Sequence, residues 1–238
     1  MRILIATVTA GGGHLAAAAA LDEAWRALHP RDVVERVDLV KFFSKLHKQI
    51  HRGGYDKLVE YAPELWGMLF KQTDSPARAR KLARWRRIFT TPSRHRFVRF
   101  VNQFKPDVVL CTHYLPFETL GRLREKKKST QPFVVSIVTD FEAHALWMDG
   151  AVDLYCVAVE ETKARLVARG APTKNIVVTG IPSATKFSAK IEPCAVRQRY
   201  GLRDDQPVLL VLSGGFGMGP VAEALVELDE VARPFFRT

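Results

Sequence analysis

Four titratable side chains of this 238-residue chain follow short apolar segments, where they could do chemistry. His14 comes directly after three glycines, and its imidazole could act as a general base because an unperturbed histidine has a pKa of about 6.5. Asp140 and His144 stand four residues apart in VTDFEAHALW (138–147), where a carboxylate could orient an imidazole or share a proton with it. His113 stands in THYLP (112–116). These residue types predict acid–base chemistry.

Two of these residues also have a plainer interpretation. His14 could bond to its own backbone at the start of a helix, and Asp140 could cap a turn. A metal site made by His14, His113 and His144 is conceivable, but their spacing is not a metal signature. We therefore predict no metal ligand.

The glycines at residues 11–13 would let the backbone approach a ligand closely. A helix beginning after them would offer free N–H groups and a partial positive charge. The Lys-Ser/Thr pair of a P-loop is missing, which disfavours an NTPase. Gly11, Gly13 and Ala16 fit the looser G-x-G-x-x-A dinucleotide pattern, and Asp38 stands where a ribose-binding acid would. A turn needed only for packing is the simpler alternative.

The elements that position these residues alternate between apolar runs and helix-like segments. Strands are expected at residues 2–8, 33–38, 107–112, 133–138, 152–157 and 176–179. Helices are expected at residues 15–28, 117–127 and 160–169, and Gly170 with Pro172 should end the last of them. This order predicts an α/β fold with a Rossmann-like parallel sheet.

A second unit begins after this sheet. We expect a first domain at residues 1–182, a proline-containing linker at 183–207 and the start of a second Rossmann-like domain at 208–238. That start consists of an apolar strand at 208–212, the glycine-rich loop SGGFGMG at 213–219 and a helix at 221–231. Because the chain ends at Thr238, we expect the second domain to be truncated.

The net charge of +11 is concentrated in one stretch. Residues 41–106 hold 16 Lys or Arg and only four acids, whereas the other residues are nearly balanced. This basic stretch should attract a polyanion, such as nucleic acid, an anionic membrane or a phosphorylated substrate. Its interleaved Trp and Phe side chains favour a membrane interface, although single aromatics there could equally be core residues.

Composition excludes several classes. Hydrophobic residues at 47% and charged residues at 26% are ordinary globular values, which excludes a disordered chain. No apolar run reaches the roughly 20 residues of a membrane-spanning helix, and the N-terminus reads as a buried strand rather than a signal peptide. The three cysteines are scattered, so no disulfide framework is expected.

Several motifs in order resemble one known family. GGGH at 11–14, THYLP at 112–116, VTDFEAHALW at 138–147, GIP at 180–182 and SGGFGMG at 213–219 are similar to the N-terminal half of the monogalactosyldiacylglycerol synthase and diacylglycerol glucosyltransferase family. These are GT-B-fold enzymes related to MurG. The spacing TD-x₃-H-x₂-W is the most specific of the matches.

The resemblance implies a hexosyltransferase. Such an enzyme transfers galactose or glucose from UDP-galactose or UDP-glucose to the hydroxyl of diacylglycerol with inversion, and it requires no metal or other cofactor. Carried over to this sequence, His14 and Asp140 are the candidates for the catalytic base. The candidate residues for acceptor or lipid binding are Gly12, Gly13, His113, Pro116, His144 and Trp147.

The resemblance also implies a location and a donor contact. The basic stretch and Pro116 would belong to a membrane-facing surface that binds anionic lipids, peripherally and on the cytoplasmic side. The donor diphosphate would be contacted by the loop residues Ser213, Gly214, Gly215 and Gly217. Most of the UDP-sugar site would lie in the part of the family that follows this chain, so a fragment, a truncated product or a second chain is expected.

Four other functions remain open at this point. A MurG-type transferase acting on a lipid-linked peptidoglycan precursor shares the fold, but the segment 138–147 argues against it. A non-catalytic module that binds anionic lipids would suit the truncated donor domain. A nicotinamide-dependent oxidoreductase follows from the glycine pattern with Asp38. Nucleic-acid binding rests on charge alone and is not expected, because no recognisable motif accompanies it.

Overall fold

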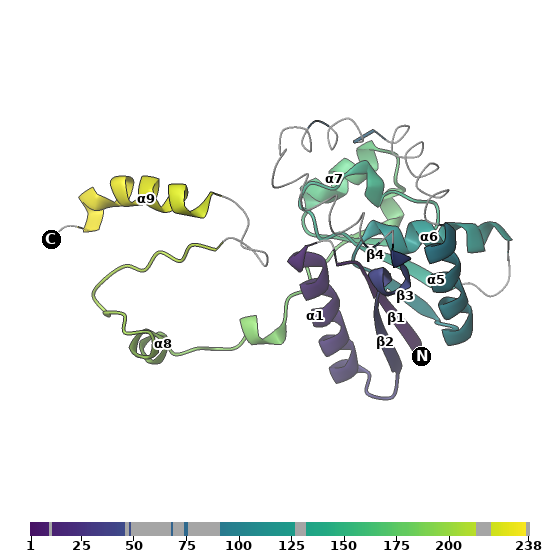
Figure 1. Ribbon diagram of the computed structural model, residues 1–238, viewed down its shortest axis with the longest axis horizontal. Coiled ribbons are helices and arrows are strands. Elements are labelled where there is room, and N and C mark those ends of the chain that lie inside the picture. The colour runs from purple at the N-terminus through teal and green to yellow at the C-terminus, as the bar shows by residue number, and fades with distance from the viewer. Residues whose placement is uncertain are drawn as a thin grey trace. The chain divides into compact units, whose positions relative to one another are not determined.

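Six parallel strands form the sheet at the centre of residues 1–187 (Figure 1). The computed structural model describes residues 1–9, 11–45, 48, 68, 74–75, 91–126, 132–212 and 220–236. The chain divides into two units, Met1–Phe187 and Ser188–Thr238, and each is described by itself.

The strands lie in the order β2-β1-β3-β4-β5-β6, and every neighbouring pair is parallel. Their bounds are β1 Arg2–Thr7, β2 Val33–Asp38, β3 Val108–Cys111, β4 Phe133–Ile137, β5 Leu154–Val157 and β6 Ile176–Val178. Each lies within the range expected from the sequence, so the parallel α/β prediction is confirmed. Five of the strands are mostly apolar because helices cover both faces of the sheet, whereas β2 at the sheet edge contains Glu35 and Arg36 and is only partly buried.

Two hydrophobic clusters fill the two faces of the sheet. On one face, Ile3 and Ile5 of β1 pack with Ala18 of helix α1 (Gly12–Leu28). On the other face, Leu4 and Ala6 belong to a larger cluster. Side chains from three further helices join that cluster, namely α5 (Thr91–Phe104), α6 (Tyr114–Lys126) and α7 (Glu160–Ala168). Figure 1 shows α1 on the opposite side of the sheet from α5 and α6.

Helix α7 ends as the sequence predicts. Gly170 has a φ of 98°, a conformation that favours glycine. Its N–H donates to the carbonyl of Val167, and the N–H of Ala171 donates to the carbonyl of Leu166. This Schellman motif satisfies two carbonyls that the helix leaves open. The remaining short helical turns of this unit are η1 Leu39–Phe42, η2 Ala145–Trp147, η3 Thr173–Asn175 and η4 Thr185–Phe187.

The strand order reverses between β1 and β3. The chain moves from β1 outward to β2, then returns to the other side of β1 to begin β3. In open α/β sheets, this reversal leaves a crevice beyond the carboxyl ends of the two strands, where ligands bind. The segments that follow β1 and β3 contain His14 and His113, respectively. The candidate residues therefore lie at the position that the topology favours for a ligand.

Residues 188–238 contain two described helices, α8 (Pro193–Arg199) and α9 (Val221–Phe236). The predicted helix at 221–231 is confirmed, and α8 lies inside the segment expected to be a linker. The predicted strand at 208–212 is wrong, since this segment has no strand assignment and Leu210 and Leu212 are 73% and 78% exposed. A strand exists only through bonds to a neighbour, and none of the described residues pairs with this segment.

The described helices bear on whether the chain could cross a membrane. None of the helices there is long and apolar enough to cross a bilayer.

Replacing Leu4 with alanine should destabilise the protein by about 2–5 kcal/mol, because Leu4 of β1 is fully buried in the core cluster that also contains side chains of α5 and α6. Leu28→Ala is the matched control, since Leu28 is 74% exposed and should change the unfolding free energy by less than about 0.5 kcal/mol. Urea unfolding followed by circular dichroism measures both. Equal losses in the two variants would contradict this description of the core.

Candidate active site

The candidate site is built from the segments that follow β1, β3 and β4. After β1 the backbone turns through Gly11, whose φ of 122° favours glycine. Helix α1 begins at Gly12, so His14 lies in its first turn. Among the described residues, a Cβ atom added at Gly13 would meet nothing within 4 Å, so close packing does not account for this glycine, which is one of the two expected to contact the acceptor.

The His14 ring lies among polar and aromatic groups from all three segments. Its Nδ1 is 2.9 Å from the hydroxyl oxygen of Thr139, which follows β4. The His113 ring meets it edge-on at a centroid distance of 4.9 Å, and the Trp147 ring lies at 6.2 Å. The structure thus brings together His14, His113 and Trp147, although His14 and Trp147 are 133 positions apart in the sequence.

Asp140 is fixed close to this ring. The indole N–H of Trp147 donates a hydrogen bond of 2.7 Å to Asp140 Oδ2, and Trp147 itself is only 2% exposed. The carboxylate is near enough to His14 to raise its pKa electrostatically. Trp147 therefore holds the Asp140 carboxylate beside the His14 imidazole.

Burial controls the protonation of His14. Desolvation lowers the pKa of His14 below its ordinary value of 6.5, and it outweighs the Asp140 carboxylate and the Thr112 backbone carbonyl, which both raise that pKa. The ring is therefore neutral at pH 7 and can accept a proton. The imidazolium formed by accepting one would be stabilised by Asp140.

The other two histidines cap turns. Nδ1 of His113 accepts from the N–H of Leu115, and Nδ1 of His144 accepts from the N–H of Leu146, each at 3.1 Å. Both histidines are buried, with 5% and 3% exposure. Within the described residues, no cluster of His, Cys, Asp or Glu is arranged to hold a metal ion. Acceptor binding by His113, His144 and Trp147 stays a prediction.

An ion pair that the sequence analysis missed anchors the segment 138–147. The Asp74 carboxylate accepts from Arg169 Nη2 at 2.6 Å and from the N–H of Ala145 at 2.9 Å. Arg169 also donates to the carbonyl of Ala143 at 2.8 Å. One available signal was the position of Asp74, the last acid before the long acid-free part of the basic stretch.

Two expectations need correction. Pro116 is buried in the first turn of α6, so its side chain is not on an exposed membrane-facing surface. Proline suits this position because N–H groups of a first helical turn have no intrahelical partner. Asp38 does not face an open ribose site, since its carboxylate accepts from the N–H and hydroxyl of Thr9 and from the N–H of Val40. It braces the loop after β1.

Other expected contacts lie outside the described residues. These are the donor-loop residues Ser213, Gly214, Gly215 and Gly217, together with most of the basic stretch between residues 46 and 90. From the described part of that stretch, α5 contributes the exposed Arg96 and Arg99.

Comparison with known proteins identifies the family. Residues 14–182 match the family model described as monogalactosyldiacylglycerol (MGDG) synthase, which covers well over half of the chain and includes His14, Asp140 and Trp147. The chain belongs to the MGDG synthase family. This membership confirms the resemblance and leaves the roles of the individual site residues as predictions.

Within the MGDG synthase family the chain is similar to curated bacterial proteins. It is 30% identical over 226 residues to the processive diacylglycerol beta-glucosyltransferase of Bacillus mycoides (strain KBAB4), covering 93% of this chain and 55% of that protein. The protein of the same name from Bacillus thuringiensis (strain Al Hakam) is 29% identical with the same coverage. The chain thus spans about half the length of these relatives.

A solved structure supports the fold alone. UDP-GlcNAc 2-epimerase from Neisseria meningitidis, bound to UDP-GlcNAc, matches with a TM-score of 0.52 at 16% identity, over 99% of this chain and 64% of the epimerase. The likeness agrees with the parallel α/β architecture.

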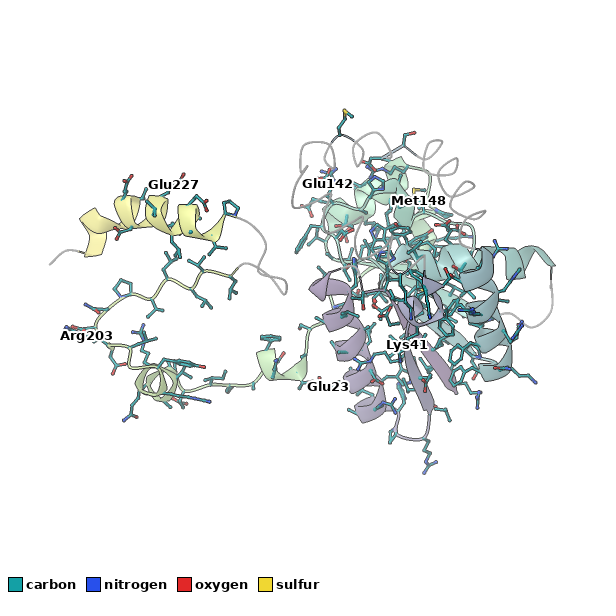
Figure 2. The ribbon with its side chains drawn as sticks, in the orientation of Figure 1. Glu23, Lys41, Glu142, Met148, Arg203 and Glu227 are labelled. Atoms are coloured by element: carbon teal, nitrogen blue, oxygen red, sulfur yellow. The ribbon has the colours of Figure 1, made fainter. Side chains whose placement is uncertain are left out.

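Asp140→Asn should lower the pKa of His14 further, because the substitution removes a carboxylate charge that raises it. The amide oxygen can still accept from Trp147, so the loop geometry is preserved. Titration of the His14 ring resonances by NMR measures the shift. Glu142→Gln is the control, since Glu142 is paired with Arg165 on the exposed side beside α7 (Figure 2). An unchanged pKa in Asp140→Asn would contradict the electrostatic coupling.

Proposed function

We propose that this protein is the acceptor-side part of a UDP-sugar-dependent hexosyltransferase that moves glucose or galactose to diacylglycerol with inversion. Membership of the MGDG synthase family supports this, and the name of the Bacillus relatives favours glucose. That name describes a beta-linked product. Since the sugar in UDP-glucose is alpha-linked, a single displacement from the opposite face would form it.

His14 carries the proposal. It is a half-buried imidazole at the strand-order reversal, its pKa is lowered by burial, and a carboxylate stands close by. In the proposed step, neutral His14 removes the proton of the acceptor hydroxyl as that oxygen attacks the anomeric carbon. The bond from that carbon to the diphosphate oxygen breaks, and UDP leaves with the electron pair.

Asp140 supports the proton transfer rather than competing for it. One of its oxygens accepts the Trp147 indole N–H, and its charge favours the imidazolium that His14 becomes. Of the two candidate bases, we therefore assign the proton to His14 and the electrostatic role to Asp140. The UDP-sugar is a substrate, and we assign no metal or cofactor to the reaction.

We further propose that the basic stretch docks the protein peripherally on the cytoplasmic face of an anionic membrane. In the described part of this stretch, α5 exposes the positive charges of Arg96 and Arg99, which an anionic surface would attract. Residues 213–217 are proposed to approach the donor diphosphate through backbone N–H groups.

His14→Ala should lower the rate of sugar transfer by roughly 10²- to 10⁴-fold, the usual contribution of a general base. The assay uses the native gene product, sized first by immunoblot, with UDP-glucose or UDP-galactose and diacylglycerol vesicles. His29→Ala is the control, because His29 is exposed at the far end of α1. A wild-type protein that binds vesicles but consumes neither donor would instead support the non-catalytic lipid-binding module.

Arg96→Glu/Arg99→Glu should weaken binding to phosphatidylglycerol vesicles by about 30-fold or more, since each basic residue near an anionic surface contributes about 1 kcal/mol. Added salt should weaken wild-type binding as well. Arg31→Glu/Lys174→Glu reverses two exposed charges outside the basic stretch and should have a smaller effect. Co-sedimentation measures all three proteins. Equal losses in the two double variants would contradict docking through this stretch.

A further inference from the structure

Two buried threonine hydroxyls meet at the backbone carbonyl of His14. Thr7 Oγ1 lies 3.2 Å from that carbonyl oxygen, Thr112 Oγ1 lies 3.0 Å from it, and the two hydroxyl oxygens are 2.9 Å apart. Each hydroxyl has a single proton, so these distances describe one shared network rather than three independent hydrogen bonds. The network joins β1, β3 and the first turn of α1.

The two hydroxyls stand where the sequence is otherwise apolar. Thr7 ends β1, whose preceding four residues are fully buried and hydrophobic, and Thr112 follows the buried Cys111 directly. The threonines are themselves 3% and 0% exposed. A valine would fill the same space, and a buried hydroxyl is unfavourable unless it is hydrogen-bonded. Core packing alone therefore does not account for threonine at either position.

Thr112 contacts the functional histidine twice. Its hydroxyl reaches the His14 carbonyl, and its own backbone carbonyl interacts with the His14 ring. Thr139 contacts the same ring at Nδ1. Because a β-branched side chain has few χ1 rotamers, the threonine hydroxyls hold their directions tightly. Groups from the ends of β1, β3 and β4 thus fix both the backbone and the ring of His14.

We propose that Thr112, together with Thr7, is a positioning residue that aims the His14 imidazole at the acceptor hydroxyl. This inference rests on the proposed function, because the aim matters only if His14 is the base. Thr112 acts through His14 and touches no reacting atom. Without its hydroxyl, the first turn of α1 would be less firmly attached to the sheet, and the imidazole would occupy its productive orientation less often.

The first experiment compares isosteric and conservative substitutions at Thr112 in the native enzyme. Thr112→Val keeps the volume and removes the hydroxyl, and it should lower kcat by roughly 10- to 100-fold with little change in KM for the UDP-sugar. Thr112→Ser keeps the hydroxyl and should retain most of kcat. A role in core packing alone predicts the reverse order, because serine leaves a small cavity and valine does not.

Thr119→Val is the matched control, since it removes a hydroxyl that bonds only within α6, to the carbonyl of Leu115. It should leave kcat unchanged. Thermal unfolding of all three variants shows whether any loss of kcat follows stability instead. Thr112→Val with wild-type kcat, or Thr112→Ser with the greater loss, would overturn the inference.

A second readout does not depend on activity. NMR titration of the His14 ring should give an altered pKa in Thr112→Val but not in Thr112→Ser or Thr119→Val, because only the first of these removes the Thr112 hydroxyl that bonds the His14 carbonyl. An unchanged His14 titration in all three would overturn the inference. Full activity in His14→Ala would instead refute the proposed base, and the NMR result would still show whether Thr112 orients the ring.

Discussion

A parallel sheet brings the carboxyl ends of its strands to one edge, and every group of the candidate site depends on that constraint. His14, Thr112 and Asp140 are far apart in the sequence, yet each follows a strand that ends at this edge. In open α/β sheets, a reversal of strand order such as that between β1 and β3 is where ligands bind. The order of the strands therefore decides which side chains meet in the site.

The site balances two opposing electrostatic effects on one imidazole. Burial favours the neutral form of His14, which is needed to accept a proton, while Asp140 favours the charged form that results. Trp147 sets this balance indirectly. Its ring is part of the apolar surroundings of His14, and its indole N–H holds the Asp140 carboxylate in place by a hydrogen bond. Trp147, although almost fully buried, thus influences the protonation of His14 through the position of Asp140.

Much of the fold could be predicted because it depends on local pattern. Five of the six strands are mostly apolar and β2 (VVERVD) is rich in β-branched valine, so all six were found from the sequence, and Gly170 marked the end of α7. The strand expected at 208–212 was wrong for the same reason, since an apolar run shows only that a strand is possible. Its formation requires a neighbour to supply hydrogen bonds, and no local pattern reports that neighbour.

The candidate site was predictable in its members but less so in their tasks. His14 and Asp140 stood out by residue type and by their place after strands. That Nδ1 of His113 and Nδ1 of His144 are used as turn caps follows from backbone geometry, which residue type does not specify. The contact between Asp74 and Arg169 joins residues 95 positions apart, and only the folded chain brings them together.

That contact also pairs an acid of the basic stretch with a base outside it. Asp74 is one of four acids among the 16 bases of residues 41–106, and its carboxylate accepts hydrogen bonds from Arg169 and from the N–H of Ala145, which both lie outside that stretch. The Asp74 carboxylate therefore offsets the positive charge of Arg169, the residue that follows α7. One of the few negative charges of the stretch is thus paired with a base that lies outside it.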